Sequence, residues 1–515
     1  MVVKKGNKMS YSKEVIEFHR YAPGVPEAKE WHQVLDKYIN YVQNTEKDPT
    51  KHSTGPNRLQ VDLVWIVCML EAKIIDQGTA KKLLTAVQSI QDGAVSSPET
   101  KSHGYAERNM IRALDNDEDL ASMINLGRTL QEPMNRLDMR NMLNDTFEDL
   151  LKLFAAVLST IEKNIDTIMP GHTHFSQAQP ITLAHYLLSV YDALRRAYDQ
   201  LALAYRDTNR NSGGCGATSG ITWPIDRDRI TELLGFDDVV EPAYDSEASQ
   251  DHSMSILFGL SNLVTILSKV AMDMCIWALE EVDMIRVEPA WCGVSSMMPN
   301  KCIPSSLFER TRIEAGYVIG EMMEAAVLVK GEPHGDVLPM LEAPKIALKA
   351  MAHAMVAVGY MTNMFEHIIP QKDRMLEYVR AGFSCATEAA YHIVKESGCG
   401  PRRAHRIVAT MVRLARERGL KAYEVTGELL DEAALFAEEQ PPRLSTKLLR
   451  ELLDPKHFIL SHNNKGGTAP QEAKRMLHKR REELNSLAEK QESRRKKIAD
   501  AEAALNSIID NILGA

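Results

Sequence analysis

The sequence predicts an all-α protein with a central bundle of long helices and smaller helical domains at its N- and C-terminal ends. Three tracts, residues 134–169, 181–212 and 243–288, contain no proline and, apart from Gly259, no glycine. Because these two residue types punctuate most folds, such gaps indicate very long helices. Aromatic residues make up only 6% of the chain, whereas 25 residues are methionine, and this balance is typical of helix-on-helix packing.

Apolar residues within two of these tracts recur with the period of an α-helix. The residues on the predicted buried faces are Leu183, Tyr186, Leu187, Val190 and Leu194 in one tract and Ile256, Leu260, Leu263, Val264, Leu267, Val270, Ala271 and Met274 in another. A helix of about 30 residues is roughly 45 Å long, which exceeds the width of a small domain. We therefore expect the long helices to pack side by side and to contact other subunits as well.

The rest of the chain flanks this bundle. Shorter helices are expected around 59–73 and 78–92, and glycine and proline breaks divide the chain after about residue 365 into short helices. The expected parts are an N-terminal helical domain (1–115), a central long-helix bundle that carries the site segments (116–364), a C-terminal helical domain (365–477) and a charged helical extension (478–515). In the extension, acidic and basic side chains alternate at i, i+4 distances, which predicts a solvated helix whose deletion leaves the fold standing.

Composition limits the possible partners and compartments. The net charge of −9 argues against a general nucleic-acid binder or a protein of anionic membrane surfaces. The seven cysteines show no CxxC spacing, so neither a disulfide framework nor a cysteine zinc site is indicated. No signal peptide is recognisable, and no apolar run reaches the roughly 18 residues that span a bilayer. We expect a soluble cytoplasmic protein.

A loop with two adjacent serines, Ser295 and Ser296, interrupts the predicted helices within WCGVSSMMPNKCIPSSLFER (291–310). Pro299 and Pro304 prevent this segment from continuing as a helix. A loop between long rigid elements can close over a cleft and exclude water, as an active-site lid does. The alternative is a plain connection between two helices.

A second polar segment, MPGHTHFSQAQPITLAH (169–185), places Thr173 and His174 before Pro180, where the next long helix is expected to begin. Polar groups at the start of a helix can bind an anion, because free N–H groups and the helix dipole favour negative charge. His172 and His174 could instead form half of a metal site. No HExxH motif or clustered Cys or Asp ligands follow, so a metal is not favoured.

A third segment, GRTLQE (127–132), offers Arg128, Thr129 and Gln131 at another expected helix start. An N-cap with a structural arginine explains this segment equally well. The glycine cluster NSGGCGATSG (211–220) has neither GxGxxG nor GxxxxGK[ST] spacing, so it is interpreted as a turn between helices.

Taken together, these segments resemble the fumarase/aspartase superfamily, and within it argininosuccinate lyase most closely. The stretches VSSMMPNKCI, GHTHFSQAQP and GRTLQE correspond to the family segments GSSxMPxKxN, GxTHxQxAQP and GRSRND. Further similarity lies in GATSGITWPIDRDRITELLGF, GFSCATEAAYHIV, AHRIVATMVRLARERG and GGTAPQEAKRML, so the resemblance covers about residues 55–477.

The resemblance implies a homotetramer with a central bundle of long helices and active sites that are each assembled from three subunits. Family members eliminate a leaving group, usually an amine, from a succinyl skeleton to give fumarate, and they need no cofactor and no metal. The implied partners are a small dicarboxylate substrate and other copies of the chain, with no role for nucleic acid or membrane.

The resemblance also assigns roles to residues. Ser295 would be the base that removes a proton next to a carboxylate, and its alkoxide would be stabilised by backbone N–H groups of the closed loop and by Lys301. His174 would orient the substrate or pass a proton to the leaving group, with Glu309 as its carboxylate partner. The residues expected to bind substrate are Thr173, Lys301, Thr129, Gln131, Arg128, Ser296 and Asn300, and His103 is a further supporting residue.

Several positions depart from the family pattern. They are Val294 in place of Gly, Ile303 in place of Asn, Leu130 and Gln131 in place of Arg-Asn, Glu309 one residue late, and segment 330–345, which lacks the family's Tyr and Gln. Losing several polar contacts together indicates a different ligand, because unpaired buried partners penalise the wrong one. We therefore expect a related N-substituted aspartate or another succinyl adduct rather than argininosuccinate. The alternatives are elimination of a non-amine group on the same fold, or a structural homologue without catalysis.

Overall fold

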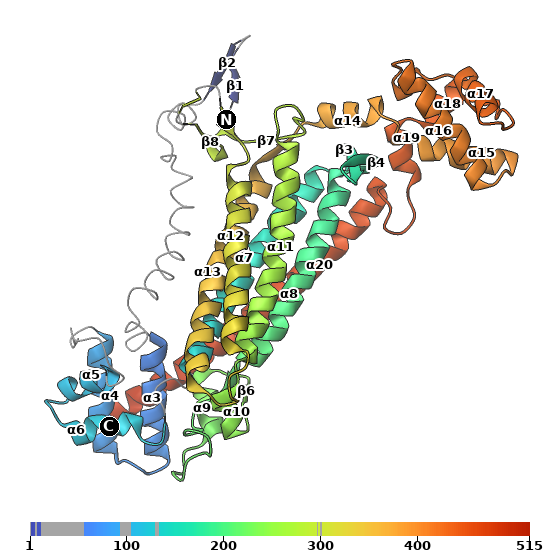
Figure 1. The fold of residues 1–515 in the computed structure, drawn as a ribbon. Helices are drawn as coiled ribbons and strands as arrows, with labels where there is room; N and C mark the ends of the chain where they lie inside the picture. Colours follow the sequence, from blue (N-terminus) through green and yellow to red (C-terminus); the bar gives the residue numbers. More distant parts are fainter. Residues whose placement is uncertain are drawn as a thin grey trace.

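The computed structural model describes residues 2–5, 8–11, 56–92, 105–128, 133–295, 297–298 and 301–514. Within these residues, five long helices run side by side to form a bundle (Figure 1). In chain order they are α7 (Met134–Lys163), α8 (Leu183–Thr208), α11 (Asp251–Trp277), α12 (Ser306–Val329) and α13 (Val337–His367). The predicted all-α fold with a central long-helix bundle is confirmed.

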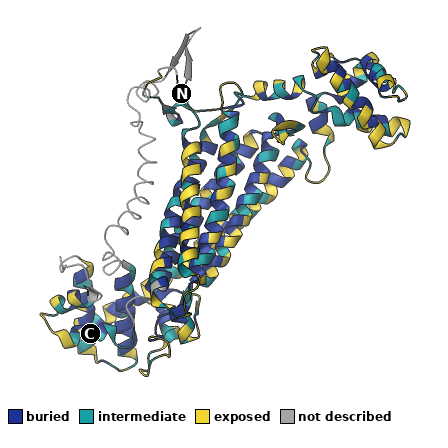
Figure 2. Cartoon of the chain, in the orientation of Figure 1, coloured by how far each residue is buried: buried dark blue, intermediate teal, exposed yellow. Residues whose placement is uncertain are grey.

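The apolar faces expected from the sequence form the core of this bundle. Leu183, Leu187 and Leu194 are fully buried, as is the face of α11 that begins at Ile256. Figure 2 shows the buried residues along the inside of the bundle and inside both terminal domains. Gly259 lies where α11 approaches α8 so closely that a Cβ atom would be 2.8 Å from Leu201 Cδ2.

The tract 243–288 is not one helix. It contains α10 (Ala243–Ala248), a break at Ser249 and Gln250, and then α11. The break contains neither glycine nor proline, and at this point Ser249 Oγ accepts a hydrogen bond from the guanidinium of the buried Arg136. α11 also has the length and mean hydropathy of a membrane span, contrary to the sequence prediction, and half of its most apolar window is buried in the bundle.

The N-terminal domain lies at one end of the bundle. It contains α3 (Pro56–Glu71), α4 (Gln77–Gln91), α5 (Tyr105–Ala113), α6 (Glu118–Ser122) and the short 3-10 helix η2 (Met123–Asn125). At the same end are β5 (Arg210–Asn211), α9 (Arg227–Leu234), β6 (Asp238–Val239) and α10. The first two predicted helices are confirmed within about three residues at each end, the ordinary uncertainty of a helix boundary.

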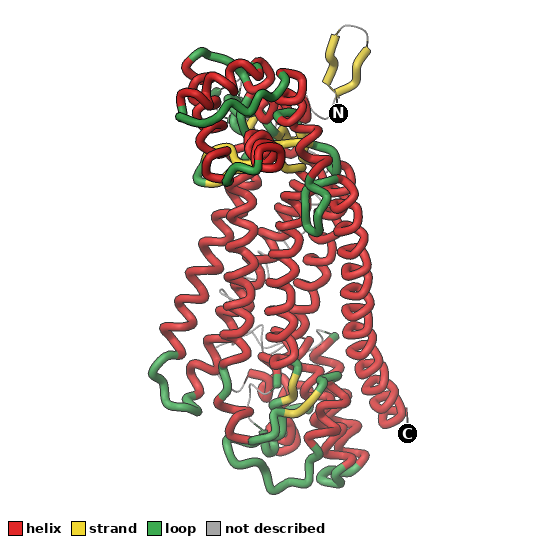
Figure 3. The backbone as a smooth tube through the Cα atoms, turned by 90° about the vertical axis from the view of Figure 1, so that its right-hand side faces the viewer, coloured by secondary structure: helices red, strands yellow, loops and turns green. Residues whose placement is uncertain are grey.

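The opposite end carries the C-terminal domain and several short strand pairs. The domain contains α14 (Lys372–Ala381), α15 (Ala386–Ser397), α16 (Pro401–Glu417), η4 (Ala422–Glu424), α17 (Gly427–Phe436), α18 (Thr446–Leu452) and α19 (Pro455–Ser461). The antiparallel pairs are β3 (Ile168–Thr173) with β4 (Ser176–Thr182), β7 (Ile285–Val287) with β10 (Ile368–Pro370), and β8 (Gly293–Val294) with β9 (Cys302–Ile303). β1 (Val2–Lys5) pairs with β2 (Lys8–Tyr11). Figure 3 shows how small these strands are beside the helices.

The charged C-terminal extension is not a solvated appendage. It belongs to α20 (Pro470–Gly514), a helix of 45 residues that runs from the C-terminal domain along the bundle to the N-terminal domain (Figure 1). Leu487 joins the core of the bundle, and Leu505 and Ile509 join the core of the N-terminal domain. The expectation of a dispensable extension is therefore wrong, because apolar residues are sparse along α20 but fall on one face.

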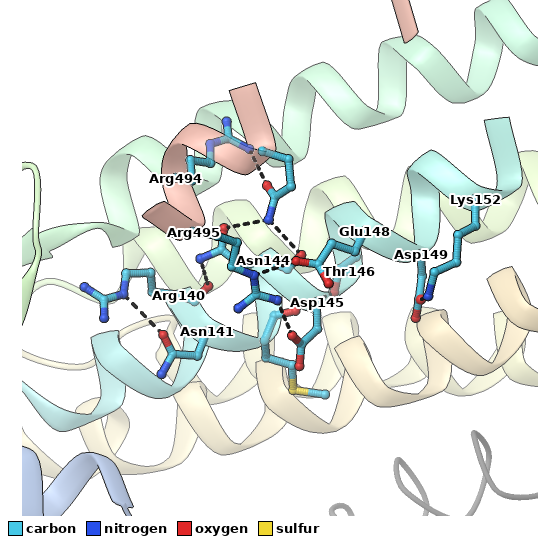
Figure 4. A network of polar contacts seen from close by, with 12 residues as sticks. Arg140, Asn141, Asn144, Asp145, Thr146, Glu148, Asp149, Lys152, Arg494 and Arg495 are labelled. Atoms are coloured by element: carbon cyan, nitrogen blue, oxygen red, sulfur yellow. Dashed lines mark hydrogen bonds and ion pairs between the residues drawn. The ribbon is translucent and has the colours of Figure 1, made fainter. Parts of the chain in front are cut away.

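Polar contacts between α20 and α7 reinforce this packing (Figure 4). The buried Gln491 amide donates hydrogen bonds to the main-chain and side-chain oxygens of Asn144, each at 3.2 Å. The Arg494 guanidinium lies 4.6 Å from the ring centre of Phe147, and Arg495 forms ion pairs with Asp145 and Glu148. The same charges that predict solvation in the sequence thus contribute to the attachment of the helix.

We expect Leu505→Ala to lower the free energy of unfolding by about 2–5 kcal/mol, because it removes a buried side chain from the junction of α20 with the N-terminal domain. Chemical denaturation of the full chain measures the change. The neighbouring Asn506→Ala alters an exposed residue of the same helix and serves as the control. Equal stability of the two variants would show that this end of α20 adds nothing to the core.

Candidate active site

Thr173 and His174 lie in a β-hairpin and not at a helix start. Pro180 belongs to β4, and α8 begins only at Leu183, where Thr182 Oγ1 accepts a hydrogen bond from His185 N. The prediction that Pro180 begins the helix is wrong because the polar residues on both sides of the turn pair as strands, with Thr173 opposite Ser176.

The turn of this hairpin consists of two residues in the left-handed region. His174 has φ 51° and Phe175 φ 55°, which is a rare conformation for residues other than glycine. The Phe175 side chain is 96% exposed, and Thr173 and His174 are exposed as well. The tip of the hairpin thus combines a backbone conformation that is costly for these residues with a fully exposed aromatic side chain.

The serine loop is closed at its base and holds the Ser295 hydroxyl in place. β8 and β9 pair on either side of the loop, with Val294 opposite Cys302. Ser295 Oγ accepts hydrogen bonds from the backbone N–H groups of Met298, at 3.0 Å, and Met297, at 3.4 Å. Two donors aimed at one oxygen stabilise negative charge on it, so this geometry lowers the cost of ionising the hydroxyl.

Of the other residues predicted to act with Ser295, the structure describes Lys301 and Glu309 but not Ser296 and Asn300. Lys301 is exposed, and its N–H donates to Met298 O at 3.1 Å, while Ser296 and Asn300 lie outside the described residues. Glu309, in the first turn of α12, accepts a hydrogen bond from Ser305 Oγ at 2.6 Å. In the described part of the chain the His174 ring and Glu309 do not bond to one another, so their predicted pairing requires two different subunits.

Arg128 forms an ion pair with Asp62 of α3. α3 lies at the opposite end of the bundle from the hairpin of β3 and β4 and from β8 (Figure 1). The Arg128 side chain is only 2% exposed and lies over the Trp65 ring, 5.7 Å from its centre. The structural interpretation of this arginine thus has direct support. Thr129, Gln131 and His103 lie outside the described residues.

One pocket of about 580 Å³ opens beside the hairpin. It is lined by hairpin residues that include His172 and Thr173, by Trp277 and Asp273 of α11, by Tyr186 of α8 and by Tyr378 of α14. Tyr186 Oη donates a hydrogen bond to Asp273 Oδ2 at 2.6 Å, and burial raises the pKa of Tyr186 well above its ordinary value. Sequence reasoning missed Asp273, although a single acid within the apolar run VAMDMCIW was a usable signal.

Comparisons with known proteins agree with this arrangement. A family model described as Lyase matches residues 68–320, and a second, described as Argininosuccinate lyase C-terminal, matches residues 383–460. The argininosuccinate lyase of Methanosarcina barkeri is 28% identical over 93% of this chain and 95% of its own length. The chain belongs to the fumarase/aspartase superfamily. Within that superfamily it is an argininosuccinate lyase-like protein.

Solved structures support the same assignment. An EDDS lyase variant with bound fumarate is 25% identical, with a TM-score of 0.83 over 90% of this chain and 93% of that protein. The class II fumarase of Schistosoma mansoni shares the fold at 14% identity, with a TM-score of 0.66 over 83% of this chain and 95% of its own. The resemblance stated from sequence motifs is therefore confirmed along the chain.

We expect Arg128→Met to lower the free energy of unfolding by about 1–3 kcal/mol, because it deprives the buried Asp62 of one of its two arginine partners. Thermal and chemical denaturation measure the loss, with Lys82→Met, an exposed change in the same domain, as the control. Unchanged stability together with a raised KM would instead assign Arg128 to substrate binding.

Proposed function

We propose that this lyase eliminates an amine from an N-substituted aspartate or a related succinyl substrate and releases fumarate. The observation that carries the proposal is the position of Ser295, whose hydroxyl accepts two backbone hydrogen bonds within the loop that matches the family's serine segment. An ordinary serine is far too weak a base at neutral pH, so this stabilisation is what the chemistry requires.

The reaction begins with loss of the proton on the carbon next to a carboxylate. Loss of this proton gives an intermediate whose carboxylate group carries two negative charges. This intermediate forms only where hydrogen-bond donors and cations are already directed at the carboxylate. Lys301 and Thr173 supply a cation and a hydroxyl for this purpose, and both are exposed in the single chain, where a substrate between subunits can reach them. His174 completes the set as the group that orients the substrate or returns a proton to the departing nitrogen.

We infer a homotetramer with shared active sites, and the surface of the bundle supports this inference. Several large apolar side chains of α12 are exposed, namely Ile313, Tyr317, Ile319, Met323 and Val327, and Phe258 of α11 is exposed as well. Burying these side chains against other copies would bring the serine loop of one chain to the hairpin of another. We place the assembled enzyme in the cytoplasm.

The substrate differs from argininosuccinate in this proposal. The segment between α12 and α13 lacks the family's tyrosine and glutamine, and Leu130 and Gln131 replace an Arg-Asn pair. Removing polar partners from a site penalises a polar ligand strongly.

We expect Ser295→Ala to reduce the rate of fumarate formation by about 10²–10⁴-fold, because the base is lost, while size-exclusion chromatography shows an unchanged assembly. The ultraviolet absorbance of fumarate follows the reaction with a panel of substituted aspartates. Ser493→Ala, an exposed change on α20, should match the unaltered protein. Near-normal turnover by Ser295→Ala would remove the base assignment.

We expect an oligomer that contains two different inactive variants to regain part of the lyase activity. Ser295→Ala and Thr173→Val each damage a different segment, so co-expressed chains assemble some sites with an intact serine loop from one variant and an intact hairpin from the other. Activity of the purified mixed oligomer measures this effect, and separately expressed variants that are only mixed after assembly are the control. If the co-expressed oligomer stays inactive, one chain supplies both segments to each site.

A further inference from the structure

The pocket beside the hairpin, here called the Asp273 pocket, has the size and walls of a site for a small organic molecule. Its volume of about 580 Å³ lies within the range of about 300–1,000 Å³ that such sites occupy. Its apolar walls are formed by Met169, Ile181, Ile276, Trp277, Val282 and Met284. These side chains suit the carbon atoms of a ligand but not its charged groups.

Asp273 supplies the one acidic group among the lining residues. Tyr186 donates a hydrogen bond to Oδ2. In the described part of the chain no lysine or arginine lines the pocket beside Asp273. A half-buried carboxylate without a cation is costly, because burial weakens its hydration and the single hydrogen bond from Tyr186 replaces only part of it. The pocket therefore favours a ligand that brings a positive charge.

The remaining polar groups agree with this preference. His172, on the hairpin side, has a pKa lowered by burial, although the charge of Asp273 acts in the opposite direction, so the neutral ring predominates at pH 7 and leaves Asp273 without a full cationic partner. Neither lysine nor arginine lines the described pocket, so a carboxylate inside it would find no cationic partner. An amino acid such as arginine, which carries its own carboxylate, is consequently a poor occupant.

Thr173 connects the pocket to the proposed reaction. It lines the same cavity as Asp273, and in the proposed function its hydroxyl holds a carboxylate of the succinyl group. A substituent on the substrate nitrogen can thus extend from Thr173 between the apolar walls to Asp273.

We propose that the Asp273 pocket binds the leaving amine, and that this amine has an apolar body, no carboxylate and a second cationic group that pairs with Asp273. The inference rests on the proposed elimination, in which the C–N bond breaks with its electron pair staying on nitrogen, the adjacent C–H proton passes to the base, and the nitrogen gains a proton. An aliphatic diamine joined through one nitrogen to a succinyl group is the substrate class that satisfies these conditions.

The reverse reaction tests this specificity in the assembled enzyme. Fumarate consumption is measured with cadaverine, with pentylamine, which has the same chain length but no second ammonium, and with arginine. The unaltered protein should use cadaverine at least about tenfold faster than pentylamine, the effect of one charge-assisted contact. Equal rates for these two amines, or a preference for arginine, would overturn the assignment.

Variants of Asp273 identify the group responsible. Asp273→Asn should reduce the ratio of the cadaverine rate to the pentylamine rate to about one. Asp273→Glu keeps the negative charge and should keep a preference for cadaverine. The Glu variant therefore tests the charge even if the Asn variant does not fold. Glu280→Gln, an exposed change just after α11 that does not line the pocket, should retain the full ratio. A full ratio in Asp273→Asn contradicts the proposal.

Calorimetry with cadaverine alone distinguishes failure of the proposed elimination from failure of the ligand assignment for the Asp273 pocket. Binding that requires Asp273, without addition of any amine to fumarate, contradicts the proposed elimination but retains the ligand class of the pocket. Addition of arginine or pentylamine as fast as cadaverine contradicts the pocket assignment but retains the elimination. Absence of both binding and addition contradicts both.

Discussion

Apolar packing between very long helices is the constraint on which the whole structure depends. Helices of 24 to 31 residues form the bundle, and each buries one face against its neighbours. Because the chain reverses direction after each helix, every connecting segment must lie at one end or the other. The hairpin of β3 and β4, which carries Thr173, and β8, which precedes Ser295, lie at one end, and α3, to which Arg128 is paired through Asp62, lies at the other. In the proposed function, a single chain therefore presents parts of a site, and association of chains completes it.

α20 adds a second constraint by joining the two ends. Its first residues follow the C-terminal domain, its middle packs against α7, and its last turns complete the core of the N-terminal domain. The N-terminal domain and the bundle consequently share one helix, which limits how far the two can move apart. Segments that meet at a site between subunits gain a stable frame from this connection.

The sequence predicts the parts of the structure that local rules govern. Breaker-free tracts predicted three of the five bundle helices, α7, α8 and α11, and helical spacing predicted the buried faces of α8 and α11. α12 and α13 contain glycine or proline and could not be predicted in this way. Prediction also failed where tertiary partners decide the outcome. Pro180 lies in a strand because Ser176 and Thr173 pair across the turn, and α20 is attached because residues as widely spaced as Leu487 and Leu505 meet two different cores. Arg128 has a charged partner in Asp62, which is distant in sequence and could not be inferred from a helix-start motif alone.

The central claim is that Ser295 of one chain removes a proton from a substrate that the hairpin of another chain holds. A crystal structure of the assembled protein with bound fumarate tests it most directly. The account predicts Ser295 Oγ within about 3–3.5 Å of a fumarate carbon, with Thr173 of a different subunit donating to a fumarate carboxylate. A closed assembly in which fumarate binds away from Ser295, or in which Ser295 and Thr173 never meet across subunits, would contradict it.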